Sequence, residues 1–285
     1  MIPAGPRAAA LQLQVFCSPA RPIPGGTFSP ITSALLMGPT EVAVVDAQFH
    51  RADVRALGDL IAASGRTLTT ILVTHGHGDH CFGSGHLLAR FPGARFVATP
   101  AVAAYLRTHL DRETAMARTL LGEDAVLPTQ LPDAMDTDVV TVDGIDMRVL
   151  DVGQGDIAPS AILHAPTLGA VCAGDVAYNG IHQMLGLGGP AEWDRWLASL
   201  TTIEALRPTV VVAGHKQPGA DDDATRVLSQ TRTYIRHFAA AYARAETAED
   251  LVAEMLDAYP AHGNVTTLQF SAAQALRRRQ RSPHG

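Results

Sequence analysis

The sequence predicts a mixed α/β (α+β) fold in which sheets pack face to face and helices cover them on the outside. Strand-like stretches with apolar runs or alternating apolar residues are interspersed with stretches whose apolar residues recur at helical spacing. The chain has 285 residues, of which 47% are hydrophobic and 18% charged, so it can bury a sizeable core. No internal repeat or low-complexity linker divides it. We therefore expect one domain over residues 1–285, with a helical C-terminal region from about residue 191 to 285.

The predicted strands come first along the chain. Residues 11–16 alternate apolar and polar side chains, as a half-buried strand does. Two apolar runs, 31–37 and 42–45, are separated by Gly38-Pro39-Thr40 and predict a hairpin. A short buried strand over 70–73 leads directly into a histidine-rich loop. Further strands are expected near residues 139–142, 147–150, 161–164, 170–173 and 209–213.

The helices are predicted from apolar spacing. In residues 53–63, the apolar positions 54, 57, 60 and 61 share one face of a helix. Other helices are expected over 84–91, 101–121 and 192–206, and two more over 224–258. The basic cluster near the end is interpreted as a solvated tail; it contains Arg277, Arg278, Arg279 and Arg281.

Composition narrows the function classes. The formal net charge of -6 and the pI of about 6.0 argue against a nucleic-acid partner. No apolar run reaches the roughly 18–20 residues of a membrane span. Three cysteines are an odd, low count that fits a reducing compartment rather than a disulfide framework. Because no convincing cleavage site follows the N-terminal segment around Arg7, we expect a cytoplasmic protein.

The strongest signal is a dense set of metal-binding residue types. His75, His77, Asp79 and His80 form an H-x-H-x-D-H pattern immediately after the strand that ends at Val73. Three imidazoles and a carboxylate within six residues suit a divalent cation such as zinc. Gly76 and Gly78 allow the tight loop that turns these side chains toward one point.

This motif and the segments after it resemble the metallo-β-lactamase superfamily over nearly the whole chain. Val44-Val45-Asp46-Ala47 is similar to an early strand that ends in an Asp beside the site. Ala173-Gly174-Asp175 is similar to the later strand whose Asp bridges two metals, and Ala213-Gly214-His215 to the final strand that supplies the last His. The resemblance implies a four-layer αββα sandwich with the site at one edge of the sheets.

The resemblance also implies a ligand set. His75 and His77 would hold one metal, Asp79, His80 and His215 the other, and Asp175 would lie between them. Zn²⁺ is the expected ion, with Mn or Fe as alternatives. Asp46 would hold the histidine loop from outside the ligand set; a simple turn at the end of its strand is an equal alternative.

One position departs from the family pattern. The family usually supplies a further His in a Gly-His-Thr-like turn, where this chain reads Asp151-Val152-Gly153-Gln154-Gly155-Asp156. Gln154 stands at the His position, and a neutral amide oxygen is a weak ligand. We therefore expect one metal bound tightly and a second bound weakly or not at all. Asp156 is the alternative ligand, although a turn role is favoured for it, and His164 is expected to be structural.

Two residues are candidates for catalysis. Asp79 would orient a metal-bound hydroxide and carry its proton. Tyr178 follows Asp175 by three residues, and in lactonases of this superfamily a Tyr at that offset donates to the substrate oxygen. A packing role for Tyr178 is an equal alternative.

Other nearby residues receive structural interpretations. The Gly-rich, apolar segment 179–190 would suit a mobile pocket wall. Within it, His182 is expected at the surface. Trp193 and Trp196 are expected to pack in a helix, Lys216 to face solvent, and Cys81 to be a small packed residue.

The function expected from these features is metal-dependent hydrolysis of a small ester, lactone or thioester. The main alternative is a metal-poor relative that binds ligand or catalyses a non-hydrolytic rearrangement, because of Gln154. The acidic pI argues against phosphodiester or nucleic-acid cleavage. His77 argues against a di-iron redox protein, because that branch of the superfamily carries Glu at this position. The expected partner is a small molecule, with no nucleic acid or membrane, and the helical C-terminal third offers a surface for a homodimer.

Overall fold

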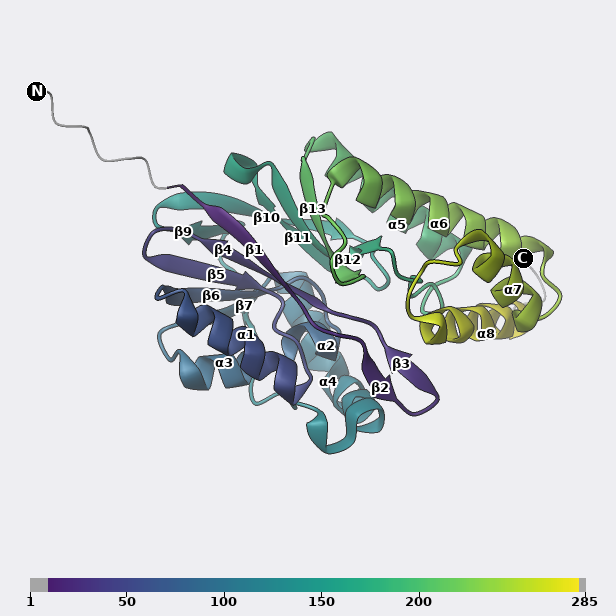
Figure 1. Ribbon diagram of the computed structural model, residues 1–285, viewed down its shortest axis with the longest axis horizontal. Helices are drawn as coiled ribbons and strands as arrows, with labels where there is room; N and C mark the ends of the chain where they lie inside the picture. The colour runs from purple at the N-terminus through teal and green to yellow at the C-terminus, as the bar shows by residue number, and fades with distance from the viewer. Residues whose placement is uncertain (1–9, 282–285) are drawn as a thin grey trace, which may run out of the picture.

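The computed structural model describes residues 10–281 and has two sheets stacked face to face, with helices on both outer sides (Figure 1). This is the four-layer αββα sandwich that the family resemblance implied. The segment around Arg7 lies outside the described residues. None of the described helices is long and apolar enough to cross a membrane.

The first sheet is built mainly from the N-terminal third of the chain. Its six strands run in the order β1-β4-β5-β6-β7-β8, and the pairs from β5 to β8 are parallel. Parallel β5 and β6 end at the same edge, where the histidine loop begins. The strands are β1 (Gln12–Cys17), β4 (Thr32–Met37), β5 (Glu41–Val45), β6 (Thr67–Val73), β7 (Arg95–Ala98) and β8 (Asp133–Ala134).

The second sheet has five strands in the order β13-β12-β11-β10-β9. Only its β12–β13 pair is parallel, and both strands end at the histidine-loop edge. Isolated bridges at this edge, His75 with Ser160 and Ile31 with His215, join the two sheets. The strands are β9 (Val139–Val142), β10 (Ile145–Gly153), β11 (Ser160–Ala165), β12 (Ala170–Asn179) and β13 (Val210–Lys216).

Helices cover the outer faces of both sheets, as Figure 1 shows. Four lie on the side of the first sheet: α1 (Arg51–Ala63), α2 (Gly78–Cys81), α3 (Ser84–Arg90) and α4 (Pro100–Leu121). On the second sheet lie α5 (Pro190–Ala205) and α6 (Ala224–Arg244), and α7 (Ala248–Ala258) and α8 (Val265–Arg281) pack beside α6. Two short 3-10 turns are η1 (Gly122–Asp124) and η2 (Pro166–Leu168).

The apolar patterns lead to two clusters of buried side chains. One lies between the two sheets and under α1, α3 and α4. The other lies between the second sheet and the C-terminal helices, where Trp193 and Trp196 are buried at 2% and 1% exposure, as predicted. Each predicted strand and helix has a counterpart in the structure.

Several short elements were not predicted. They are the small hairpin of β2 (Arg21–Ile23) and β3 (Gly26–Phe28), the strands β7 and β8, helix α2 and the two 3-10 turns. Helix α8 falls within the predicted helical C-terminal region, although it was not predicted as a separate helix. The basic cluster belongs to α8, which runs to Arg281, and not to a free tail. Arg277, Arg278 and Arg281 are exposed, as expected, whereas Arg279 donates 2.6 Å hydrogen bonds to the carbonyls of Tyr242 and Ala245 and so helps to dock the last helix.

Candidate metal centre

The histidine loop is fixed by a buried carboxylate at the end of the neighbouring strand. β6 delivers the chain to Thr74, whose backbone N–H donates to Oδ1 of Asp46 at 2.9 Å and whose hydroxyl donates to Oδ2 at 2.9 Å. The same Oδ2 lies 2.9 Å from Nδ1 of His80. Asp46 thus holds both ends of the loop and orients the His80 ring with Nε2 toward the site.

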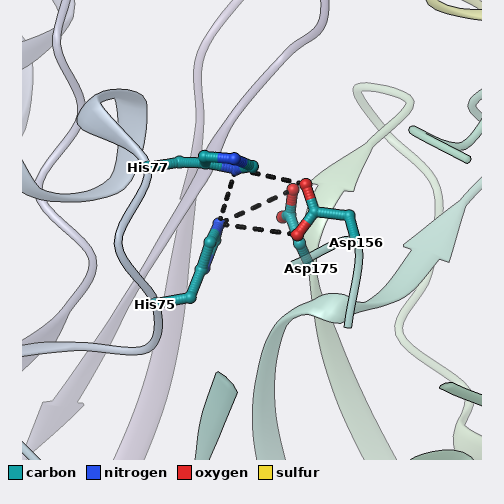
Figure 2. Close-up of side chains that lie close together, drawn as sticks. All are labelled: His75, His77, Asp156 and Asp175. Atoms are coloured by element: carbon teal, nitrogen blue, oxygen red, sulfur yellow. Dashed lines mark hydrogen bonds and ion pairs between the residues drawn. The ribbon is translucent and has the colours of Figure 1, made fainter. Parts of the chain in front are cut away.

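A first group of side chains brings together His75, His77, Asp156 and Asp175, with one potential ligand atom of each within 4.8 Å of the others (Figure 2). Nε2 of His75 lies 3.2 Å from Nδ1 of His77 and 3.9 Å from Oδ2 of Asp175. Nδ1 of His77 lies 3.1 Å from Oδ2 of Asp156. All four residues are buried.

A second group contains Asp79, His80 and His215, which satisfy the same 4.8 Å criterion. Oδ2 of Asp79 lies 3.3 Å from Nε2 of His80 and 3.4 Å from Nε2 of His215. Asp175 reaches this group as well, with Oδ1 3.2 Å from His80 and Oδ2 3.3 Å from His215. Asp175 therefore lies between the two groups, where the sequence expects a bridging ligand.

The backbone of β12 explains how Asp175 reaches both groups. The pairing of β12 with β13 shifts register between Cys172 and Gly174 and again between Gly174 and Tyr178. Gly174 has a φ of +49°, and a Cβ there would meet the Thr74 hydroxyl oxygen at 2.3 Å. The irregular strand and the glycine together turn Asp175 inward beneath the histidine loop.

The residues fit divalent cations. Nε2 of His80 and Oδ1 of Asp175 are buried 3.2 Å apart, and neither makes a well-aligned hydrogen bond with any of the described residues. Such atoms are expensive to bury unless something binds them. Burial alone would lower the pKa of His77 and of His215. The carboxylate of Asp156 reverses this and raises the pKa of His77 to about 9, and Asp175 raises that of His215 to about 10. The site concentrates negative charge and nitrogen donors, a combination that suits zinc, manganese or iron.

The structure places the side chain of Asp156, rather than that of Gln154, beside His77. Its side-chain amide donates to the carbonyl of Gly155 at 3.2 Å, and its backbone N–H points to Ser199. The turn instead directs Asp156 to His77, although a turn role was favoured for this Asp; its Oδ1 also accepts from the N–H of Ile157 at 2.7 Å. One turn therefore gives Asp156 both roles, and the first group has a charged donor where a neutral amide was expected.

Tyr178 faces the centre rather than only packing. Its hydroxyl donates to Oδ2 of Asp175 at 2.8 Å, and its ring stacks on His215 with 5.5 Å between centroids. Burial and the nearby charge of Asp175 raise the pKa of Tyr178 well above the usual phenol value. The phenol therefore keeps its proton and remains a hydrogen-bond donor.

A cavity of about 510 Å³ opens onto both groups. Its floor includes His77, Asp79, Asp156, Asp175 and His215. Its walls come from the β2–β3 hairpin, α4, the loop after β12 and the start of α8, and are mostly apolar. Small-molecule sites have volumes of about 300–1,000 Å³ and a similar lining.

Two charged residues at this cavity, Arg112 and Glu113, were not predicted from the sequence. Glu113 on α4 is 1% exposed, and its Oε1 accepts from Nη2 of Arg112 at 2.8 Å. Arg112 also donates to the hydroxyl of Tyr105 at 2.8 Å. The available signal was the helix itself, because Glu113 falls on the buried face of α4 with Val102, Leu106 and Ala117.

Two other expectations are wrong. His182 is fully buried, with Nδ1 2.8 Å from the hydroxyl of Tyr234. Lys216 is 6% exposed and pairs with Asp222 at 2.8 Å. In both cases the C-terminal helices, or the loop leading into them, cover a residue expected at the surface. Cys81 is a small buried residue, as expected.

Comparison with known proteins identifies the superfamily to which this chain belongs. The sequence model of the metallo-beta-lactamase superfamily matches residues 26–215, so the chain belongs to this superfamily. A metallo-beta-lactamase family protein from Thermus thermophilus has a similar structure, with a TM-score of 0.63, 23% identity, and coverage of 95% of this chain and 93% of the other. A metallo-beta-lactamase from Pontibacter korlensis has a TM-score of 0.58 and 18% identity, covering 79% and 99%. These two likenesses concern the fold.

A sequence relative is more specific about chemistry. The chain is 32% identical over 154 residues to a hydroxyacylglutathione hydrolase of Parasynechococcus marenigrum (strain WH8102). The match covers 52% of this chain and 53% of the relative, so the chain spans about half the length of that protein. Superfamily membership and the buried donor groups fit a metal-dependent enzyme, and the relative is named a hydrolase.

Proposed function

We propose that this protein hydrolyses the thioester of a small acyl compound with the help of bound divalent metal ions. The observation that carries the proposal is the pair of His/Asp groups at the floor of a cavity, in a superfamily member whose sequence relative is a thioester hydrolase by name. Esters and lactones are cleaved by the same acyl chemistry and are the next candidates.

The proposed reaction joins a water oxygen to the acyl carbon and breaks the carbon–sulfur bond. The water proton goes to a base, and the thiolate leaves and is protonated. A bound divalent cation would lower the pKa of a water molecule that it binds and would polarise the acyl oxygen. His75, His77, Asp156 and Asp175 would hold one ion, and Asp79, His80, His215 and Asp175 the other.

Two side chains of this chain have suitable positions for proton and charge handling. Asp79 lines the cavity and has a buried carboxylate that can orient the water and hold its proton. The phenol of Tyr178 lines the same cavity and can donate to the acyl oxygen as negative charge develops there. In the absence of substrate this phenol donates to Asp175.

The proposal is tested by loading the purified protein with zinc, manganese or iron and comparing kcat/KM on matched acyl substrates. The set is a thioester, an oxygen ester, a lactone and a phosphodiester. We expect the thioester to be turned over fastest and His75→Ala to remove turnover. Faster cleavage of the ester or the lactone would show that the substrate belongs to that class and not to the thioesters. Absence of acyl hydrolysis in protein with a full complement of metal would overturn the proposal.

A further inference from the structure

The cavity is strongly apolar beyond the metal-binding groups. Three of the large apolar side chains that are exposed on the described surface stand around it, namely Met116 at 38%, Leu187 at 38% and Phe270 at 41% exposure. Phe28, Leu120 and Met184 line it further in. Exposed apolar side chains that gather at one cavity mark a binding surface rather than chance exposure.

Away from the metal-binding groups, the described lining of the cavity has no unpaired cationic side chain. Of its four carboxylates, those of Asp79, Asp156 and Asp175 belong to the metal-binding groups, and the fourth is that of Glu113. Among the described lining residues Arg112 is the single Lys or Arg, and its guanidinium is already bonded to Glu113 and Tyr105. A group that carries several carboxylates or phosphates would find no free cationic side chain there.

The apolar walls are held in place before any ligand arrives. The backbone N–H of Thr27 in the β2–β3 hairpin donates to the Thr266 hydroxyl on α8 at 3.1 Å. Arg278, also on α8, donates to the carbonyl of Leu187 in the loop after β12 at 3.3 Å. A preformed apolar wall binds an apolar ligand without the cost of ordering the wall.

We infer that the acyl group of the substrate is an extended apolar chain, which lies against Met116, Leu187 and Phe270 with its carbonyl at the metal centre. This inference rests on the proposed function and deepens it, since it names the substrate class. It also separates this protein from its sequence relative, whose name denotes a hydroxylated acyl group.

The test uses neutral S-acyl N-acetylcysteamine thioesters with acetyl, butyryl, hexanoyl and octanoyl groups on the metal-loaded full chain. Burying one methylene is expected to raise kcat/KM about three- to fourfold. Because the chain is only partly enclosed at the mouth, we expect a rise of at least about 100-fold from acetyl to octanoyl. A flat or falling series, with thioesters still hydrolysed, would overturn the inference and leave the proposed function standing.

Two variants test whether the apolar wall residues cause the chain-length preference. Phe270→Ser and Met116→Ser are each expected to lower the octanoyl-to-acetyl ratio about tenfold. Val265→Ser is the matched control, because Val265 is an apolar α8 residue of 36% exposure that does not line the cavity. An unchanged ratio in both wall variants would overturn the inference. So would a change from dimer to monomer in Phe270→Ser with a flat chain-length series, because the patch would then bind a second copy.

A binding measurement separates this inference from the proposed function. Neutral methyl ketones such as 2-butanone and 2-decanone mimic the acyl chain but have no bond to hydrolyse. Calorimetric titration should show tighter binding of the longer ketone with a negative heat-capacity change, and weaker binding in Phe270→Ser. That result without thioester hydrolysis would refute the proposed function while supporting the apolar ligand class. Equal binding of both ketones would count against the ligand class.

Discussion

Oδ2 of Asp156 lies 3.1 Å from Nδ1 of His77, although the neighbouring Gln154 was expected to face the site. Asp156→Asn removes the charge at nearly constant size. Loss of a residue that only supports a metal ligand commonly lowers metal affinity 10–100-fold. Loss of a ligand itself should therefore lower the affinity at least about 100-fold. Metal content after dialysis, measured by mass spectrometry, should fall by one ion per chain.

Gln154→Ala is the matched control for Asp156→Asn. Its side-chain amide bonds to Gly155 and not to a histidine, so we expect the metal content of Gln154→Ala to equal that of the wild type. Loss of an ion in Gln154→Ala but not in Asp156→Asn would reverse the assignment.

Tyr178→Phe removes only the hydroxyl that donates to Asp175. We expect kcat to fall about 10²- to 10³-fold, as when one donor to a developing oxyanion is lost, while bound metal stays the same. Tyr242→Phe is the control, because this ring packs on Trp193 away from the cavity. Lost metal with normal turnover per bound ion would instead make Tyr178 a support for Asp175.

Asp46→Asn tests whether the histidine loop is held from the neighbouring strand. The Asn amide has an acceptor at only one of the two oxygen positions. Either the Thr74 backbone N–H, which donates to Oδ1, or the Thr74 hydroxyl and His80 Nδ1, which share Oδ2, would then face an NH2 group that cannot accept. We expect metal affinity to fall about 10- to 100-fold with the secondary structure retained. Titration against a chelating dye, with circular dichroism of the same samples, measures both. An unchanged metal affinity would show that Asp46 is only a turn residue at the end of β5.

Gly214→Ala tests the close approach of β13 to the bridging carboxylate. A Cβ at Gly214 would lie 2.0 Å from Oδ1 of Asp175, so the carboxylate or the strand must move. Overpacking of this kind costs about 1–3 kcal/mol, and displacing Asp175 should weaken both ion sites. The thermal midpoint with and without zinc should fall, and the gain from zinc should shrink.

Gly93→Ala is the control for Gly214→Ala, since nothing lies within 4 Å of the place that its added methyl group would take. Its thermal midpoint and its response to zinc should match those of the wild type. A zinc response in Gly214→Ala equal to that of Gly93→Ala would contradict the crowding at Asp175.

The sequence was informative where a pattern is local. Strands β5 and β6 and helix α4 follow from apolar spacing within one segment, and the H-x-H-x-D-H motif is contiguous. The resemblance added His215 and Asp175, which lie far along the chain. These residues do meet the motif in the structure, within hydrogen-bonding range of His80 or Asp79.

Features that depend on backbone direction at one turn were not predictable in the same way. Whether Gln154 or Asp156 enters the site depends on the turn after β10, which spacing does not specify. Likewise, His182 and Lys216 are polar by type, but packed segments from the C-terminal part of the chain bury them. Arg277 to Arg281 look like a charged tail, yet α8 buries its Leu268, Ala272 and Leu276 face against the rest of the fold.

Helix α8 has a consequence for how this protein can diverge. The seven residues of the two metal-binding groups all lie within residues 26–215, which match the superfamily, whereas α8 lies beyond that range. Phe270 and Thr266 can therefore mutate without touching an ion-binding residue or the strands that carry them. If α8 sets the acyl-chain preference inferred above, relatives that share the metal-binding groups can differ in substrate through changes in this last helix alone.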